Sequence, residues 1–309
     1  MGMSYAYGPA DEGEAMRVLS RYLELGGNFL DTAEIYGPYE NEKLLGRFLV
    51  GVPREDVVVA TKFGFRLKDG KITGADSSPA NIRKVCDESL QRLGLEYIDL
   101  FYQHRVDPSV PIEEVVATVG ALVQAGKVRA IGLSEASPET LRKANAVHPI
   151  AALQSEYSLW SRDVEDGGLE TCRELGIGFV PYSPLGRGFL TGSIQKAADL
   201  DASDWRLTNP RFRGDALERN LELAGHVKSL AAKKGCSPAQ LALSWVLAQG
   251  DDIVPIPGTK RVKYLEDNLG AVNVSLAPEE LAEIDRLFPV GVAAGTRYTE
   301  DGMGMIDRS

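Results

Sequence analysis

Hydrophobic and polar positions alternate along this chain in two patterns. Short runs rich in Val, Ile and Leu are each followed by a longer stretch whose apolar residues recur with helical spacing. Apolar runs without a polar side are typical of strands that are buried on both faces, as in parallel sheets. The runs lie at 28–33, 57–64, 98–104, 128–135, 151–158, 176–185 and 253–259. The pattern therefore predicts seven strands separated by helices.

Helix-start signals support this alternation. Four of the stretches open on proline, which suits the first helical position because that position needs no amide hydrogen. In three of them a serine that can cap the helix precedes the proline. The expected helices cover 12–25, 79–93, 111–125, 138–147, 215–234 and 238–249. Strands that alternate with helices indicate a parallel α/β fold.

Two architectures fit this order, an open doubly wound sheet and a closed (β/α)8 barrel. No Gly-x-Gly-x-x-Gly motif follows the run at 28–33, so the nucleotide-binding fingerprint of the open fold is missing. Candidate chemical groups also follow several strand ends, as they do at the rim of a barrel. We therefore expect a (β/α)8 TIM barrel. Because only seven runs are found, its first strand is expected to be missing or truncated, which leaves an edge open.

We expect one barrel domain over residues 1–309. Residues 192–214 are mostly polar, punctuated by Gly and Pro and without periodicity, which predicts a loop or lid at the rim. Residues 289–309 are glycine-rich and non-periodic, which predicts an irregular tail.

Composition narrows the class of protein. The chain is 44% hydrophobic and 25% charged, which is ordinary for a soluble globular protein. Its net charge of -10 argues against a nucleic-acid partner. Three cysteines without CxxC spacing suit a reducing compartment. With no apolar run of about 18 residues and no basic-then-apolar leader, we expect a cytoplasmic protein without a membrane partner.

Four side chains of different chemistry lie at or just beyond the ends of the first three predicted strands: Asp31, Tyr36, Lys62 and His104. Reduction of a carbonyl group needs a hydride on carbon and a proton on oxygen. A tyrosine can give that proton, although a reference pKa of about 10 makes it a weak acid. The Lys62 ammonium would lower this pKa, and Asp31 would keep the lysine charged. His104 can donate a hydrogen bond to the carbonyl oxygen.

Longer phrases that contain these residues resemble the aldo-keto reductase superfamily. They follow in order from about residue 8 to 290, as DTAEIYG, VVVATKFG, DLFYQH, IGLSE, QSEYS, PYSPLGRGFLTG and VPIPGTK. The resemblance implies a barrel with an N-terminal hairpin ahead of its first strand. It also implies NADPH-dependent reduction of a small aldehyde or ketone without a metal. Tyr36 would be the proton donor, with Asp31, Lys62 and His104 beside it. The phrases look most like bacterial and plant members that reduce varied aldehydes.

The resemblance extends to the nicotinamide half of the cofactor. Ser134 and Gln154 match residues that hydrogen-bond the nicotinamide amide, and Tyr182 matches the aromatic residue that stacks on its ring. After Ser134 the family usually has Asn, whereas this chain has Glu135. The residues that match the pyrophosphate loop are Ser183, Leu185 and Arg187.

The adenosine half would contact the segment IPGTKRVKYLEDN. The matching residues are Gly258, Thr259, Lys260, Asp267 and Asn268. Many members have Lys and Arg where this chain has Gly258 and Tyr264. Lys260 and Arg261 are then the cations for a 2′-phosphate, which favours NADP; a solvated basic loop is the alternative.

Two other functions are compatible with parts of the sequence. One is a sensor or interaction module that binds NADPH on the same barrel with little turnover; the complete set of four residues argues against it. The other is a metal-dependent hydrolase using Asp31, Glu34 and His104. Three histidines without a His-x-His pair make that hydrolase a poor match.

Overall fold

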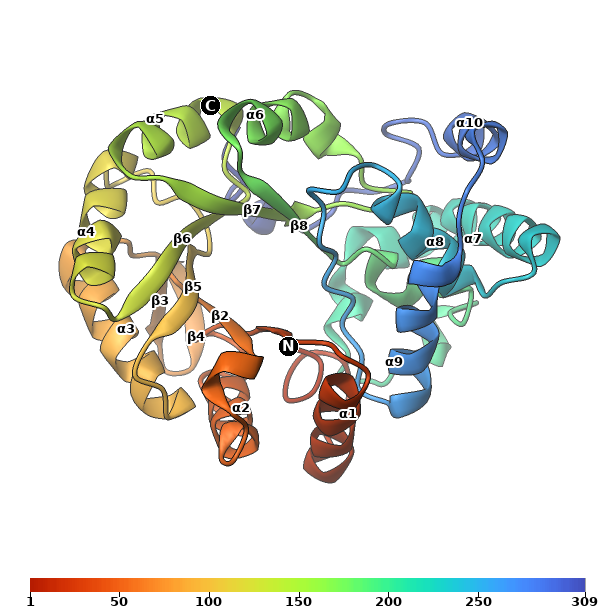
Figure 1. Ribbon diagram of the computed structural model, residues 1–309. Coiled ribbons are helices and arrows are strands. Elements are labelled where there is room, and N and C mark those ends of the chain that lie inside the picture. Colours follow the sequence, from red (N-terminus) through yellow and green to blue (C-terminus); the bar gives the residue numbers. More distant parts are fainter. Residues whose placement is uncertain (309) are drawn as a thin grey trace.

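Six of the predicted strands form one parallel sheet that curls into a partial barrel (Figure 1). The computed structural model describes residues 1–308. In spatial order the strands are β1 (Phe29–Asp31), β2 (Val58–Phe63), β5 (Ile98–Gln103), β6 (Val128–Ser134), β7 (Ile150–Glu156) and β8 (Gly178–Tyr182). Strands β2, β5 and β7 are buried on most of their length, as their apolar runs predict, whereas in β1 only Leu30 is buried. The predicted α/β barrel class is confirmed.

The seventh predicted strand, 253–259, is reduced to two isolated bridges with β8. Pro255 and Pro257 have no amide hydrogen, so the amides of Val254 and Ile256 make the hydrogen bonds to the β8 backbone. The prediction of a regular strand is therefore wrong here. Within residues 1–308 no strand precedes β1, and the N-terminus lies on the open side of the curl (Figure 1).

Helices surround the sheet, and α2 to α6 follow its outer face (Figure 1). They are α1 (Glu12–Glu24), α2 (Glu40–Leu49), α3 (Pro79–Leu93), α4 (Ile112–Gln124), α5 (Pro138–Val147), α6 (Gly168–Leu175), α7 (Gly214–Lys234), α8 (Pro238–Leu247), α9 (Val262–Leu269), α10 (Pro278–Leu287) and α11 (Glu300–Met303). Ser78, Ser137 and Ser237 accept a hydrogen bond from the amide three residues later, as the capping signals predict. The apolar faces of α3 to α8 share one core cluster with the sheet.

A hairpin that the sequence analysis did not predict follows β2. Its strands β3 (Phe65–Lys68) and β4 (Lys71–Ala75) are antiparallel. Asp69 and Gly70 form the two-residue connection, and both have positive φ. This Asp-Gly pair between short strands was a signal that could have revealed the hairpin.

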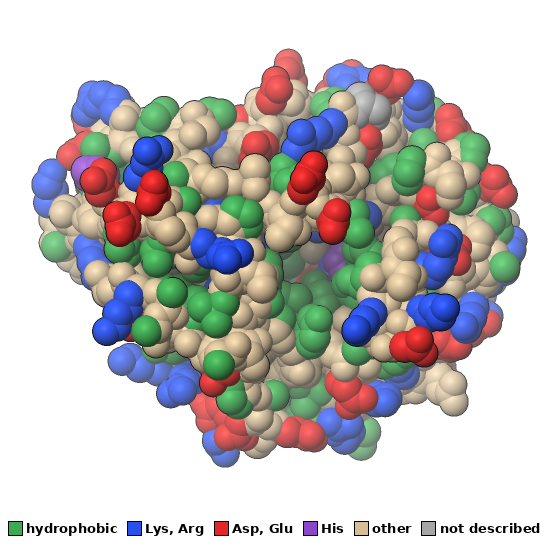
Figure 2. Space-filling view, turned by 180° about the vertical axis from the view of Figure 1, so that it is seen from behind, with side chains coloured by type: hydrophobic (Ala, Val, Ile, Leu, Met, Phe, Trp, Pro, Cys, Tyr) green, Lys and Arg blue, Asp and Glu red, His purple; other side chains and the backbone are tan. Residues whose placement is uncertain are grey.

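The two segments expected to be irregular contain short helical pieces. Residues 192–214 include 3-10 turns at Ala197–Asp199, Trp205–Thr208 and Pro210–Phe212. Within residues 289–308 the structure has the single-turn helix α11. Figure 2 shows the opposite side of the molecule, where hydrophobic side chains gather in a hollow with charged groups around it. Among the described residues, no helix combines the length and apolar character needed to cross a membrane.

Candidate active site

The structure brings the four residues predicted for proton transfer together at the carboxyl ends of β1, β2 and β5. Asp31 ends β1, Lys62 lies one residue before the end of β2, and His104 directly follows β5. Tyr36 lies in the turns between β1 and α2. Lys62 Nζ donates to Asp31 Oδ1 and is 3.5 Å from the Tyr36 hydroxyl oxygen. The rings of Tyr36 and His104 meet edge to face with centroids 5.9 Å apart.

Lys62 is fully buried, and its ammonium is held by two acceptors. Burial lowers the pKa of Lys62, while the Asp31 carboxylate opposes that change. Besides Asp31, Nζ donates to the backbone oxygen of Thr32 at 2.8 Å. The lysine thus has the carboxylate partner that the sequence analysis assigned to it.

The pKa of Tyr36 differs from the expected direction. Burial raises it well above its ordinary value, Asp31 raises it further, and the Arg105 guanidinium opposes both. The predicted lowering of the pKa by Lys62 does not dominate, because burial is the largest cause of the shift and Asp31 adds to it. Tyr36 is therefore protonated throughout the neutral range, which suits a proton donor.

His104 is neutral at physiological pH. Burial lowers its pKa well below the ordinary value, and the cations Arg105 and Lys62 lower it further. The ring nitrogen Nδ1 is buried and has no hydrogen-bond partner among the described residues. An unpaired buried polar atom costs about 1–3 kcal/mol, so this ring is suited to a polar group of a bound molecule.

The residues matched to the nicotinamide lie on the three strands that follow. Ser134 ends β6, Gln154 lies in β7 and Tyr182 ends β8. Gln154 Nε2 donates to Asp31 Oδ2 at 2.8 Å, which links these strands to the proton-transfer residues. The Tyr182 hydroxyl donates to Glu135 Oε1 at 2.8 Å. One rim thus carries both sets of residues.

The loop matched to the pyrophosphate has an unusual backbone conformation. Ser183, Gly186, Arg187 and Gly188 all have positive φ. Neighbouring residues in such conformations can direct several amide groups to one side, which favours an anion. Leu185 is buried in this loop. The amides of Gly186 and Gly188 already donate to the backbone oxygens of Ser183 and Leu185, so a pyrophosphate site in this loop stays a prediction.

The adenosine segment lies before and within α9. Gly258 and Thr259 are irregular, while Asp267 and Asn268 belong to α9. Lys260 is not simply solvated, because its Nζ donates to the backbone oxygens of two residues near the N-terminus, Tyr7 and Pro9.

The first turn of α9 follows this basic loop and already attracts a carboxylate. The amide of Val262 donates to Glu14 Oε1 at 3.3 Å. A helix N-terminus beside Lys260 and Arg261 fits a phosphate group.

The C-terminal tail also contributes to this rim, which was not predicted from the sequence. Arg297 donates to both carboxylate oxygens of Glu135 at 3.0 Å. The hydroxyl oxygens of Tyr298 and Tyr182 are 2.7 Å apart. Glu135 has a φ of 54°, unusual for a residue other than glycine. The presence of Glu135 where the family usually has Asn could have indicated an unusual role for this residue. The sequence around Arg297 and Tyr298 contains no comparable signal.

A second missed group is the buried cluster around Glu156. Its carboxylate accepts from Arg187 at 2.6 Å, from Arg211 at 3.4 Å and from the Ser161 hydroxyl at 2.8 Å. Burial alone would raise the pKa of Glu156, yet the arginines lower it below its ordinary value. This cluster holds Arg187, which was assigned to the cofactor loop.

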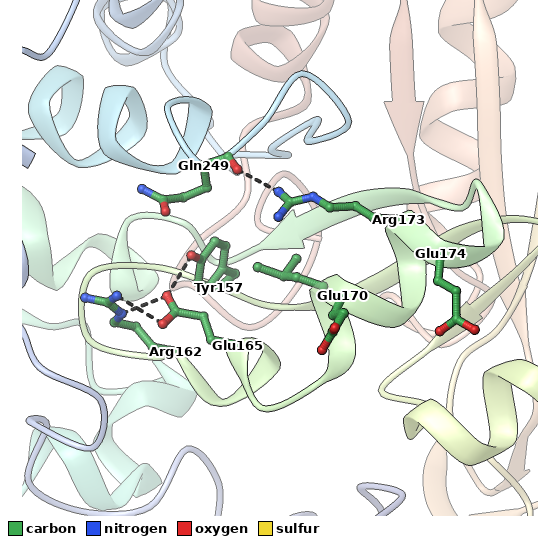
Figure 3. A pocket seen from close by; sticks show the side chains of 8 residues that line it. Tyr157, Arg162, Glu165, Glu170, Arg173, Glu174 and Gln249 are labelled. Atoms are coloured by element: carbon green, nitrogen blue, oxygen red, sulfur yellow. Dashed lines mark hydrogen bonds and ion pairs between the residues drawn. The ribbon is translucent and has the colours of Figure 1, made fainter. Parts of the chain in front are cut away.

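A surface pocket beside α6 has no part in this rim (Figure 3). Several of its polar side chains are already engaged in hydrogen bonds. Glu165 accepts from Arg162 and from the Tyr157 hydroxyl, while Arg173 donates to the backbone oxygen of Gln249 at 2.6 Å. We assign no chemistry to it.

Glu34 gives a pH-dependent stability prediction. Burial raises its pKa to about 8, and Glu42 contributes in the same direction. The folded chain then keeps a proton that the unfolded chain loses above its ordinary value of about 4.5, so stability is lost as pH rises from there to about 8. Glu34→Gln should remove this loss and add about 2–4 kcal/mol to the free energy of unfolding at pH 8, with little change near pH 4.5. Urea denaturation across that pH range measures the free energy of unfolding of both proteins. If it changed with pH in the same way in wild type and Glu34→Gln, the raised pKa of Glu34 would be contradicted.

The protonated Glu34 also bears on the hydrolase alternative. A neutral carboxyl group is a poor metal ligand. Moreover, residues 1–308 contain no group of three or more His, Cys, Asp or Glu side chains placed to hold a metal ion.

Known proteins resemble this chain in sequence and in structure. A sequence model of the aldo/keto reductase family matches residues 1–288. A probable aldo-keto reductase 1 from Glycine max is 47% identical over 299 residues, which cover 96% of this chain and 86% of that protein. A glycerol dehydrogenase from Gluconobacter oxydans has a similar structure, with a TM-score of 0.81 and 31% identity over 92% of this chain and 88% of the other. An aldo-keto reductase from Klebsiella pneumoniae, solved with NADPH, shares the fold with a TM-score of 0.71 and 24% identity, over 93% and 88% of the two chains.

Proposed function

The chain belongs to the aldo/keto reductase family of NAD(P)H-dependent oxidoreductases, and we propose that it reduces an aldehyde or ketone to the alcohol with NADPH. The observation that carries this proposal is the contact of Lys62 with both Asp31 and the Tyr36 hydroxyl, beside a neutral His104. A protonated phenol, a cation and a neutral imidazole at one point can together deliver a proton to a carbonyl oxygen.

Each residue has a separate task in this reaction. NADPH, when bound, supplies the hydride for the carbonyl carbon. Tyr36 gives its hydroxyl proton to the carbonyl oxygen, and the phenolate left behind is stabilised by the Lys62 ammonium. His104 donates a ring N–H to the same oxygen, orienting the substrate and stabilising its developing negative charge. Asp31 keeps Lys62 charged.

The cofactor would lie along the rim described above. Ser134, Gln154 and the ring of Tyr182 would hold the nicotinamide. The positive-φ loop that includes Ser183, Leu185 and Arg187 would hold the pyrophosphate. The adenosine end would meet the segment that includes Gly258, Thr259, Lys260, Asp267 and Asn268. Lys260 and Arg261 support a preference for the 2′-phosphate of NADPH over NADH.

The test is consumption of NADPH by the purified chain with a reactive aromatic aldehyde such as 4-nitrobenzaldehyde, followed by the absorbance of the reduced nicotinamide. We expect turnover with NADPH and slower turnover with NADH. Tight NADPH binding with no turnover on aldehydes or ketones would contradict the proposal and favour a cofactor-binding module. Unchanged activity in the presence of a chelator is expected as well.

A further inference from the structure

Four arginine side chains are buried among residues 1–308, and three of them have carboxylate partners. Arg187 and Arg211 both contact Glu156, and Arg297 binds Glu135 through two nitrogen atoms. The fourth, Arg105, is nine-tenths buried and makes no ion pair with any described residue. Arg105 is therefore the one buried arginine among the described residues that has no carboxylate partner.

The hydrogen bonds of Arg105 all go to neutral oxygen atoms, and its guanidinium carbon also lies 5.9 Å from the centre of the Tyr298 ring. Nη1 donates to the backbone oxygen of His104 at 2.6 Å and to Ser134 Oγ at 3.3 Å. Nη2 donates to the Tyr298 hydroxyl over a long 3.4 Å. Glu135 acts on Arg105 from a distance, but its two oxygens are bound to Arg297. Burial disfavours the Arg105 charge, although the surrounding oxygens leave its pKa raised overall, and a bound anion would supply the direct counter-ion that the described residues lack.

The assignment of donors and acceptors around Arg105 shows which of its hydrogen bonds an anion would replace. Tyr182 has one hydroxyl proton, and it donates that proton to Glu135. Tyr298 must then donate to Tyr182, which leaves its own oxygen to accept from Arg105. Because a charged acceptor binds a guanidinium more strongly than a neutral hydroxyl at 3.4 Å, an incoming anion would displace Tyr298.

The Arg105 charge acts on the pKa of Tyr36 and on that of His104, so its guanidinium lies near the proposed proton-transfer residues. The planar fork of an arginine matches the oxygens of a carboxylate or a phosphate. We propose that Arg105 binds an anionic oxygen group of the substrate, which makes this enzyme selective for aldehydes or ketones that carry a carboxylate or phosphate ester near the carbonyl. This inference rests on the proposed reductase activity and names its substrate class.

Matched pairs of substrates test the inference. Each carboxybenzaldehyde isomer is compared with its methyl ester, and glyceraldehyde 3-phosphate with glyceraldehyde, using wild type, Arg105→Met and Arg105→Lys. We expect Arg105→Met to lower kcat/KM about 10- to 100-fold for the anionic member of a pair and to change the neutral member little. Arg105→Lys keeps the charge and should recover part of the loss. The pair with the larger selective loss distinguishes carboxylate from phosphate.

A nearby arginine provides the control. Arg66 is exposed on the β3–β4 hairpin, which follows the same end of β2, so Arg66→Met removes one positive charge without touching the site. It should leave the ratio of anionic to neutral substrates unchanged. Equal losses on both members of each pair in Arg105→Met would overturn the inference, because they would assign Arg105 to the acidity of Tyr36 or to folding alone.

A binding measurement keeps the inference separate from turnover. Calorimetric titration with benzoate, with benzamide as its neutral analogue, requires no reaction. Benzoate should bind the wild type at least about 10-fold more tightly than Arg105→Met, while benzamide shows no such difference. Equal affinity of both proteins for benzoate and for phenyl phosphate, titrated in the same way, would overturn the inference even if the chain reduced no carbonyl. Absence of turnover with selective benzoate binding would instead count against the reductase proposal.

Discussion

Replacing Tyr36 with phenylalanine is expected to lower kcat by about a thousand-fold while leaving the affinity for NADPH almost unchanged. The substitution removes the hydroxyl that lies 3.5 Å from Lys62 Nζ and with it the proposed proton donor. A positioned proton donor contributes typically about 10²–10⁴-fold to a rate, which sets the size of the effect. Steady-state kinetics with an aromatic aldehyde, together with fluorescence titration of NADPH, measure the two quantities.

Tyr39→Phe is the matched control, because it removes a hydroxyl from the same turn outside the site. The Tyr39 ring lies against Arg92, away from Lys62. This variant should keep nearly all of its activity. Turnover by Tyr36→Phe at the rate of Tyr39→Phe would rule out Tyr36 as the proton donor. Equal thermal unfolding of both variants would show that a loss of rate is chemical.

The pH profile provides an independent view of the same residue. Because burial keeps Tyr36 protonated, the rate of reduction should be flat through neutral pH and should decline only as the phenol ionises in alkali. His104 adds no transition near its ordinary value, since burial lowers its pKa well below that value. A sharp loss of rate near neutral pH would contradict both assignments.

Local signals explain which parts of this structure were predictable. The helix at 79–93 begins and ends where Ser78, Pro79 and Gly94 place its boundaries, because capping and backbone conformation are short-range effects. Strands buried on both faces are visible as apolar runs for the same reason. The parallel order then brings Asp31, Lys62 and His104 to one rim without further information. Assembly of the candidate site therefore follows from local patterns together with the fold class.

Long-range pairing explains what was missed. Glu135 and Arg297 are 162 positions apart, and the tail around Arg297 has no periodicity that would indicate its path. Burial of opposite charges from irregular segments depends on the completed fold, so neither segment alone predicts it. The strand predicted at 253–259 was wrong for a local reason. Its residues looked like a buried strand, but Pro255 and Pro257 prevent a regular ladder.

The largest expected loss of stability comes from Glu156→Gln. Glu156 is 1% exposed, and its carboxylate contacts both Arg187 and Arg211. The amide would leave both guanidinium groups buried without a counter-ion. Breaking a buried pair in this way costs about 3–5 kcal/mol, so chemical denaturation should show a decrease of that size in the free energy of unfolding.

Glu165→Gln is the appropriate comparison, since Glu165 pairs with Arg162 in a more exposed position and should lose about 1 kcal/mol or less. Because the arginines lower the pKa of Glu156, the stability that it contributes is present above its ordinary value and is lost as pH falls through the folded value. The difference between wild type and Glu156→Gln should therefore shrink in acid. Adding Arg211→Met should recover part of the loss, because it removes one of the two unpaired charges. An additive second loss would mean that Arg211 stabilises the fold by packing rather than through Glu156.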